Sequence, residues 1–168
     1  MMDWSLILET HGRIVWKTVN RIIDDDDDAA DCFQETFLAA LEFSRKNQIR
    51  NWPGLLKRLA TTSALAHLRT RLRKSVPSAL AGDPAEVADS ACQPPDVAEG
   101  QELFACLRQG LAALPQQQAE ACCLRFLEDL DYGEIAEELN ITVNHVGVLL
   151  NRARAALRES LLAFAPPS

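Results

Sequence analysis

The sequence predicts an all-α protein made of two small helical domains joined by a flexible linker. Apolar residues recur at helical spacings of three and four on both sides of the linker, and no stretch alternates at period two. Residues 75–101 contain four prolines and two glycines without a sustained period, so we expect them to form the flexible linker. A chain of 168 residues, 48% of them hydrophobic, can bury the cores of two such domains. The predicted domains are therefore residues 1–74 and 102–168.

Three helices are predicted in the N-terminal domain from the spacing of apolar residues. The first helix places on one face Leu8, Val15, Val19 and Ile22. The second begins after the aspartate run at residues 24–28 and buries Phe33, Phe37 and Leu41. The third runs from about Trp52 to Lys74 and contains six leucines, which are Leu55, Leu56, Leu59, Leu65, Leu68 and Leu72.

The C-terminal domain is predicted to begin with a leucine-lined helix. Its leucines lie four, four and three residues apart, at Leu103, Leu107, Leu111 and Leu114. Pro115 then opens a new helix, since its fixed φ suits a first helical turn. We expect that helix to be lined by Cys123, Phe126 and Leu130.

A helix-turn-helix is predicted at residues 131–157. Asp131 and Glu134 have the spacing of a capping box at the start of the short first helix. Asn140 stands at the sharp turn, where asparagine tolerates a positive φ, and Thr142 can cap the last helix. The apolar stripe of that last helix comprises Val143, Val146, Leu150, Ala153, Leu157 and Leu161. This geometry presents the start of the second helix to a DNA major groove, although plain helix bundles contain similar corners.

Charge is distributed unevenly along this acidic chain, whose net charge is −7. Residues 43–76 contain no acidic side chain and nine basic ones, which are Arg45, Lys46, Arg50, Lys57, Arg58, Arg69, Arg71, Arg73 and Lys74. Such a basic surface attracts a polyanion within about a Debye length, ~8–10 Å, whatever the total charge, and a solvated helix face is the alternative. The two domains carry +2 and −4, so we expect that they can close on each other, with the linker as the hinge.

Several classes of function are not expected. The five cysteines lack C-x-x-C or Cys/His spacing, so neither disulfides nor a metal site is predicted. Asp24, Asp26, Asp28 and Glu35 have the spacing of calcium ligands, but Ala29 stands where the calcium loop requires glycine. We recognise no phosphate-binding glycine loop and no nucleophile with a base, so we expect no enzyme and no cofactor. Short apolar stretches and an N-terminus unlike an export signal predict a cytoplasmic protein without membrane insertion.

Two ordered groups of motifs resemble a known family, the small extracytoplasmic-function (ECF) group of bacterial RNA polymerase sigma factors. The fourth conserved region of that family is similar to LPQQQ at 114–118, LRF at 124–126, YGEIAEEL at 132–139 and NRARAAL at 151–157. The second region is similar to DAADCFQETFL at 28–38. The resemblance implies a region 2-like bundle in residues 1–74, a region 4-like helix-turn-helix in residues 102–168, and a role in directing core RNA polymerase to promoters.

The resemblance also implies partners and site residues. Core RNA polymerase would bind the second helix through Asp31, Gln34, Glu35 and Phe37, the last of which is also a candidate core residue. Promoter DNA would bind the third helix through Lys57, Arg58, Thr62, Arg69, Arg71, Arg73 and Lys74. In the helix-turn-helix, the candidate DNA-binding residues are Thr142, Asn144, His145, Asn151, Arg152 and Arg154. An anti-sigma factor is a further candidate partner.

The chain departs from the family pattern at two places that carry chemistry. Thr62 replaces an asparagine whose amide can both donate to and accept from a base. Gly147, Val148 and Leu149 replace polar and basic residues, and Val148 and Leu149 are expected to be exposed. Two alternatives therefore remain, a sigma-like protein acting through protein contacts and a stand-alone helix-turn-helix regulator that binds palindromic DNA as a dimer.

Overall fold

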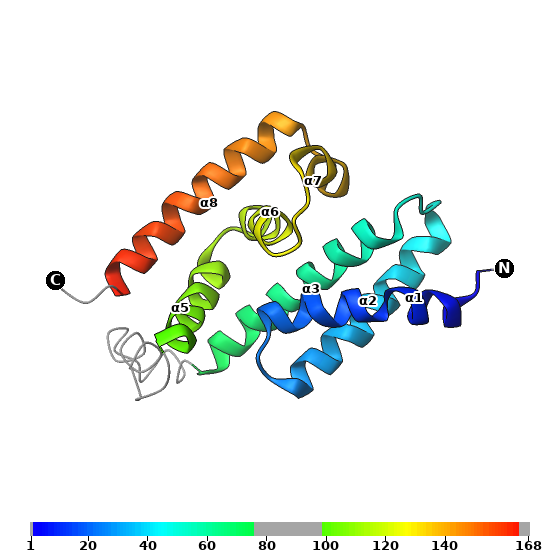
Figure 1. The fold of residues 1–168 in the computed structure, drawn as a ribbon, viewed down its shortest axis with the longest axis horizontal. Coiled ribbons are helices and arrows are strands. Elements are labelled where there is room, and N and C mark those ends of the chain that lie inside the picture. Colours follow the sequence, from blue (N-terminus) through cyan, green and yellow to red (C-terminus); the bar gives the residue numbers. More distant parts are fainter. Residues whose placement is uncertain (1, 76–98, 165–168) are drawn as a thin grey trace.

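The computed structural model describes residues 2–75 and 99–164, and these residues contain helices and no strand (Figure 1). The helices are α1 (Trp4–Ile22), α2 (Asp26–Lys46), α3 (Trp52–Ser75), α5 (Glu99–Ala113), α6 (Gln116–Phe126), α7 (Tyr132–Leu139) and α8 (Val143–Phe164). The all-α prediction is confirmed. Most of the predicted linker, residues 76–98, lies outside the described residues. We call residues 2–75 the N-terminal half and residues 99–164 the C-terminal half.

Aspartate side chains cap the first two helices. Asp3 accepts hydrogen bonds from the backbone N–H of Ser5 at 3.0 Å and of Leu6 at 3.3 Å. Asp25 caps α2 in the same way, accepting from Asp27 at 2.8 Å and Asp28 at 3.2 Å. The prediction that the second helix begins after the aspartate run is wrong, because three aspartates of the run form the first turn, where the helix dipole favours them.

The core of the N-terminal half is built by α1, α2 and α3, which pack on one another. Val15, Val19 and Ile22 are buried as predicted, but Leu8 is 41% exposed and Ile7 is buried in its place. Trp4 makes an edge-on contact with Trp52, with 5.8 Å between the ring centroids. Because residues 4 and 7 lie on the same side of α1, this contact turns Ile7 toward the core.

The helix-turn-helix has a core of its own, formed by Ala121, Leu124, Leu130, Ile135, Ala136, Val146, Leu149 and Leu150. Four sequence-based expectations fail there and in the helices beside it. Leu149 is buried, whereas three residues predicted to be inward are exposed, namely Leu103, Phe126 and Val143. Both α6 and α7 contact α8, so its buried face is wide enough to include Leu149, while Val143 occupies its uncovered first turn. Val148 is exposed, as predicted.

The two halves pack against each other through α3. Figure 1 shows α3 between α1 and α2 on one side and α5 and α6 on the other. One continuous apolar cluster joins Leu65 and Leu68 of α3 to Leu111, Leu114 and Cys123 of the C-terminal half. Thus α3 is buried on two sides, and the described residues are in a closed arrangement.

No helix of the described residues is both long and apolar enough to span a bilayer. Within residues 2–75 and 99–164, no three His, Cys, Asp or Glu side chains are grouped as metal ligands would be.

Candidate functional site

The α2 residues assigned to polymerase binding divide into exposed and buried groups. Asp31, Gln34 and Glu35 are exposed on α2. Phe37 is only 9% exposed and packs on Phe33, with ring centroids 5.0 Å apart. Its assignment to the docking surface is therefore corrected, because its ring lies in the hydrophobic core.

Glu35 is held in place by two side chains of α3. Its Oε2 accepts a hydrogen bond from Ser63 Oγ at 2.8 Å and lies 3.0 Å from His67 Nε2. No local pattern in the sequence indicates these contacts, because Ser63 and His67 lie 28 and 32 positions from Glu35. Ser63 and His67 therefore fix the position of a carboxylate assigned to docking.

The last turns of α3 carry the basic residues that stay at the surface. Arg73 and Lys74 are exposed. Arg71 is close to three carboxylates of the aspartate run, 3.8 Å from Asp24, 3.4 Å from Asp25 and 3.4 Å from Asp28. These acids offset much of the charge that Arg71 would offer to DNA.

The other basic residues assigned to DNA on α3 face the C-terminal half. Lys57 Nζ donates to the backbone oxygen of Glu128 at 3.4 Å, and Arg69 Nη2 donates to the backbone oxygen of Leu114 at 2.9 Å. Arg58 Nε lies 3.5 Å from Glu138 Oε2, an ion pair whose arginine side chain is 24% exposed. In this arrangement the C-terminal half occupies these polar groups.

The side chain of Thr62 also faces the C-terminal half. Its hydroxyl lies 3.0 Å from Glu120 Oε1 and 2.9 Å from the backbone oxygen of Arg58. Glu120 is only 7% exposed and also accepts a hydrogen bond from the Gln116 amide at 3.1 Å. The residue that replaces the family's asparagine therefore contacts a buried carboxylate.

Glu138 approaches α3 at its N-terminal end. A Cβ at Gly54 would lie 2.6 Å from Glu138 Oε1, so the missing side chain at position 54 permits this approach. Burial raises the pKa of Glu138 above its ordinary value, and the neighbouring Arg58 guanidinium opposes that rise. The positive end of the α3 dipole also favours a carboxylate here.

The helix-turn-helix has the predicted caps. Asp131 Oδ1 accepts from the Glu134 N–H at 2.8 Å, and Glu134 Oε1 accepts from the Asp131 N–H at 3.2 Å, which completes the capping box. Asn140 is left-handed, with φ 55° and ψ 50°. Thr142 Oγ1 accepts from the His145 N–H at 3.1 Å. These three predictions are confirmed.

Most of the DNA-binding candidates of this motif are available at its surface. Thr142, Asn144, His145, Asn151 and Arg152 are exposed.

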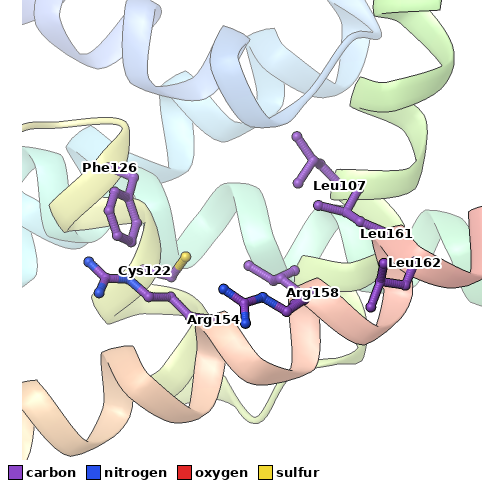
Figure 2. Close-up of a pocket in the computed structure, with 8 residues that line it drawn as sticks. Leu107, Cys122, Phe126, Arg154, Arg158, Leu161 and Leu162 are labelled. Carbon is purple, nitrogen blue, oxygen red and sulfur yellow. The ribbon is translucent and has the colours of Figure 1, made fainter. Parts of the chain in front are cut away.

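Arg154 is also exposed, but its guanidinium lies over the Phe126 ring, 5.0 Å from the centroid. Figure 2 shows it at the edge of an apolar groove of about 410 Å³, which Leu107, Cys122, Leu161 and Leu162 also line. Arg154, which was assigned to DNA binding, therefore also contacts this groove.

The structure defines an all-α protein of the helix-turn-helix class, with a basic helix packed against that motif. Residues 104–157 match the family model described as sigma-70, region 4. The chain is 29% identical over 161 residues to the ECF RNA polymerase sigma factor SigE of Mycolicibacterium smegmatis, covering 96% of this chain and 62% of that protein. It is 25% identical over 169 residues to the ECF RNA polymerase sigma factor SigW of Bacillus subtilis, covering 92% and 87%.

A solved structure supports the fold. The sigma factor RpoE of Bartonella quintana, crystallised with the anti-sigma factor NepR, superposes with a TM-score of 0.57 at 18% identity, covering 96% of this chain and 98% of that chain. The resemblance seen in the sequence is confirmed, since the chain is similar to ECF sigma factors over most of its length. It spans less than two thirds of the length of the M. smegmatis relative.

Proposed function

We propose that this protein is an ECF-type sigma factor that binds core RNA polymerase and directs promoter-specific initiation in the cytoplasm. The observation that carries the proposal is the capped helix-turn-helix of residues 131–157, which lies within the segment that matches sigma-70 region 4. Sigma factors are not enzymes, so the proposed roles of the chain are in binding. No cofactor is part of the proposal.

The proposed division of labour follows the sequence domains. Residues 1–74 would act as region 2, with Asp31, Gln34 and Glu35 docking on the polymerase and α3 contacting promoter DNA. Residues 102–168 would act as region 4, with the start of α8 in the major groove. Residues 75–101 would connect the two. An anti-sigma factor is a further proposed partner, supported by the complex in which the structural neighbour was crystallised.

A second candidate function is a sigma-like protein that acts through protein contacts alone. The observation in its favour is that Lys57, Arg58, Thr62 and Arg69 contact the C-terminal half. Burial of Leu149 removes one argument for it, because the exposed apolar pair expected on α8 is reduced to Val148. The structure adds no observation that favours a stand-alone dimeric regulator.

The experiment that tests the proposal is co-elution of the full chain with bacterial core RNA polymerase, in competition with a housekeeping sigma factor. Glu35→Lys reverses one charge on the proposed docking face, and Glu9→Lys makes the same change at an exposed position of α1. We expect Glu35→Lys to abolish co-elution and Glu9→Lys to retain it, with both variants equally helical by circular dichroism. Absence of binding by the unmodified chain at micromolar concentration would contradict the proposal.

A further inference from the structure

We propose that Val148 determines base preference in the DNA duplex that the helix-turn-helix binds, by contacting the 5-methyl group of a thymine in the major groove. Asn144, one turn earlier on α8, binds an adenine beside it. The inference rests on the proposed function, because that function places the start of α8 in the major groove. It adds the class of base pair that this helix prefers, which is A·T.

Val148 lies at the centre of the exposed face of α8. It is 37% exposed, whereas Leu149 next to it is buried. The positions three and four residues before and after Val148 share its side of the helix. All four carry exposed polar side chains, namely Asn144, His145, Asn151 and Arg152. An apolar side chain therefore occupies the middle of the polar surface that α8 offers to DNA.

The thymine methyl group matches the exposed side chain of Val148. The core of the helix-turn-helix takes Val146, Leu149 and Leu150 from the same helix, and Val148 stays outside it at the surface. In the major groove, thymine presents a 5-methyl group that apolar side chains contact. Contact between the two removes apolar surface of both from water, so the valine favours thymine over the other bases.

The start of α8 holds the Val148 side chain in a defined position. Thr142 Oγ1 accepts from the His145 N–H at 3.1 Å, which caps the helix one turn before Val148. Tyr132 of α7 lies beside the same part of α8, since a Cβ at Gly147 would be 3.8 Å from its Cε2. Valine is β-branched and has one strongly preferred rotamer in a helix, so its methyl groups are placed before DNA binds. Little side-chain entropy is then lost on binding.

The polar neighbours of Val148 favour the same class of base pair. The amide of Asn144 can donate to adenine N7 and accept from its 6-amino group. Guanine is most often recognised by arginine or lysine, and among the four polar neighbours only Arg152 is such a cation. Arg152 lies in the third turn of α8, farther from the helix start that contacts bases, so we assign it to a phosphate. Residues 142–157 contain no acidic side chain that would repel the phosphates.

The first test compares thymine with deoxyuridine, which lacks the 5-methyl group and keeps every hydrogen-bonding group. The full chain, alone and bound to core RNA polymerase, selects duplexes from a pool with a randomised segment. We expect the selected duplexes to share an element dominated by A·T pairs. Each thymine of that element is then replaced in turn by deoxyuridine. One replacement is expected to weaken binding about fourfold, the effect of one buried methyl group.

The second test assigns the methyl contact to Val148. Val148→Ala keeps a good helix former and shortens the side chain, so it should bind the thymine element about fourfold more weakly and no longer distinguish thymine from deoxyuridine there. The matched control, Val143→Ala, removes the same atoms from a valine that is 52% exposed. Val143 lies five residues earlier, about 140° around the helix, so this control should keep the distinction. Circular dichroism checks that both variants are as helical as the unmodified chain.

Several results would overturn the inference. These are equal binding to thymine and deoxyuridine at every position, an element dominated by G·C pairs, and no duplex selection by either form. Thymine dependence that Val148→Ala leaves unchanged would also overturn it, because another part of the chain would then contact the methyl group.

The outcome for the sigma function is separate. If the chain alone selects a thymine-dependent element through Val148 but never binds polymerase, the inference is supported and the sigma function is rejected. If the polymerase complex initiates transcription while thymine and deoxyuridine bind equally, the sigma function is supported and the inference is rejected.

Discussion

The contact between Thr62 and Glu120 offers a sharp test of how strongly the two halves are coupled. Thr62→Val keeps the branched shape of the side chain and removes its hydroxyl. That hydroxyl has one proton and two acceptors, the Arg58 carbonyl at 2.9 Å and Glu120 Oε1 at 3.0 Å. A charged carboxylate is a stronger acceptor than a backbone carbonyl, so we assign the hydroxyl proton of Thr62 to the hydrogen bond with Glu120 Oε1.

The expected cost follows from the burial of the acceptor. A hydrogen bond to a charged group contributes about 1.5–3 kcal/mol, and the Gln116 amide continues to donate to Glu120 after the substitution. We therefore expect Thr62→Val to lower the free energy of unfolding by about 1.5 kcal/mol. In a Glu120→Gln background the bond is neutral, so the same substitution should cost only about 0.5–1 kcal/mol.

Urea unfolding, monitored by tryptophan fluorescence and circular dichroism, measures the loss of unfolding free energy caused by Thr62→Val in each of the two backgrounds. Thr70→Val is a matched control, since the Thr70 hydroxyl makes the same bond within α3, to the Ala66 carbonyl at 3.0 Å, but at an exposed position. This control is expected to change stability by less than about 0.5 kcal/mol. If Thr62→Val costs the same in the unmodified chain as in the Glu120→Gln background, the coupling is refuted.

Three further predictions concern caps and thiols. Asn140→Ala should destabilise the protein by about 1 kcal/mol in urea unfolding because φ is 55°, whereas Asn140→Gly should change little. Hydrogen bonds from the N–H groups of Asp28 and Asp27 lower the pKa of Asp25 below its ordinary value of 3.8. The stability it contributes is complete above pH 3.8 and is lost as pH falls through the lowered pKa, so the urea midpoints of Asp25→Ala and the unmodified chain should converge in acid and differ at pH 7. Burial raises the pKa of Cys32 to about 11, so in a Cys92→Ser background this thiol should react with a disulfide reagent at about pH 8 only as fast as the protein opens; rapid native-state labelling would be inconsistent with the structure.

The features that local chemistry determines could be predicted from the sequence. Asp131, Asn140 and Thr142 were placed correctly because a capping box, a left-handed turn residue and an N-cap each depend on neighbours within a few positions. The helical period also located α3 within one residue at its C-terminal end.

What depends on a distant partner could not be predicted in the same way. Leu149 was expected at the surface because a single stripe does not reveal that both α6 and α7 cover α8. Thr62 was assigned to DNA, and nothing near it in sequence indicates Glu120, which lies 58 positions away. Opposite net charges indicated that the halves could close, but not which residues meet.

The burial of α3 on two sides constrains how this protein can evolve. A helix with a free outer face can change its ligand preference by substitutions that leave the fold unaffected. Here the face assigned to DNA also contacts α5, α6 and α7. Each substitution there alters the packing of the C-terminal half as well as the surface offered to a ligand. Under the proposed function, preference for a DNA sequence and the ease of opening would both depend on this one helix, so selection on either would change the other.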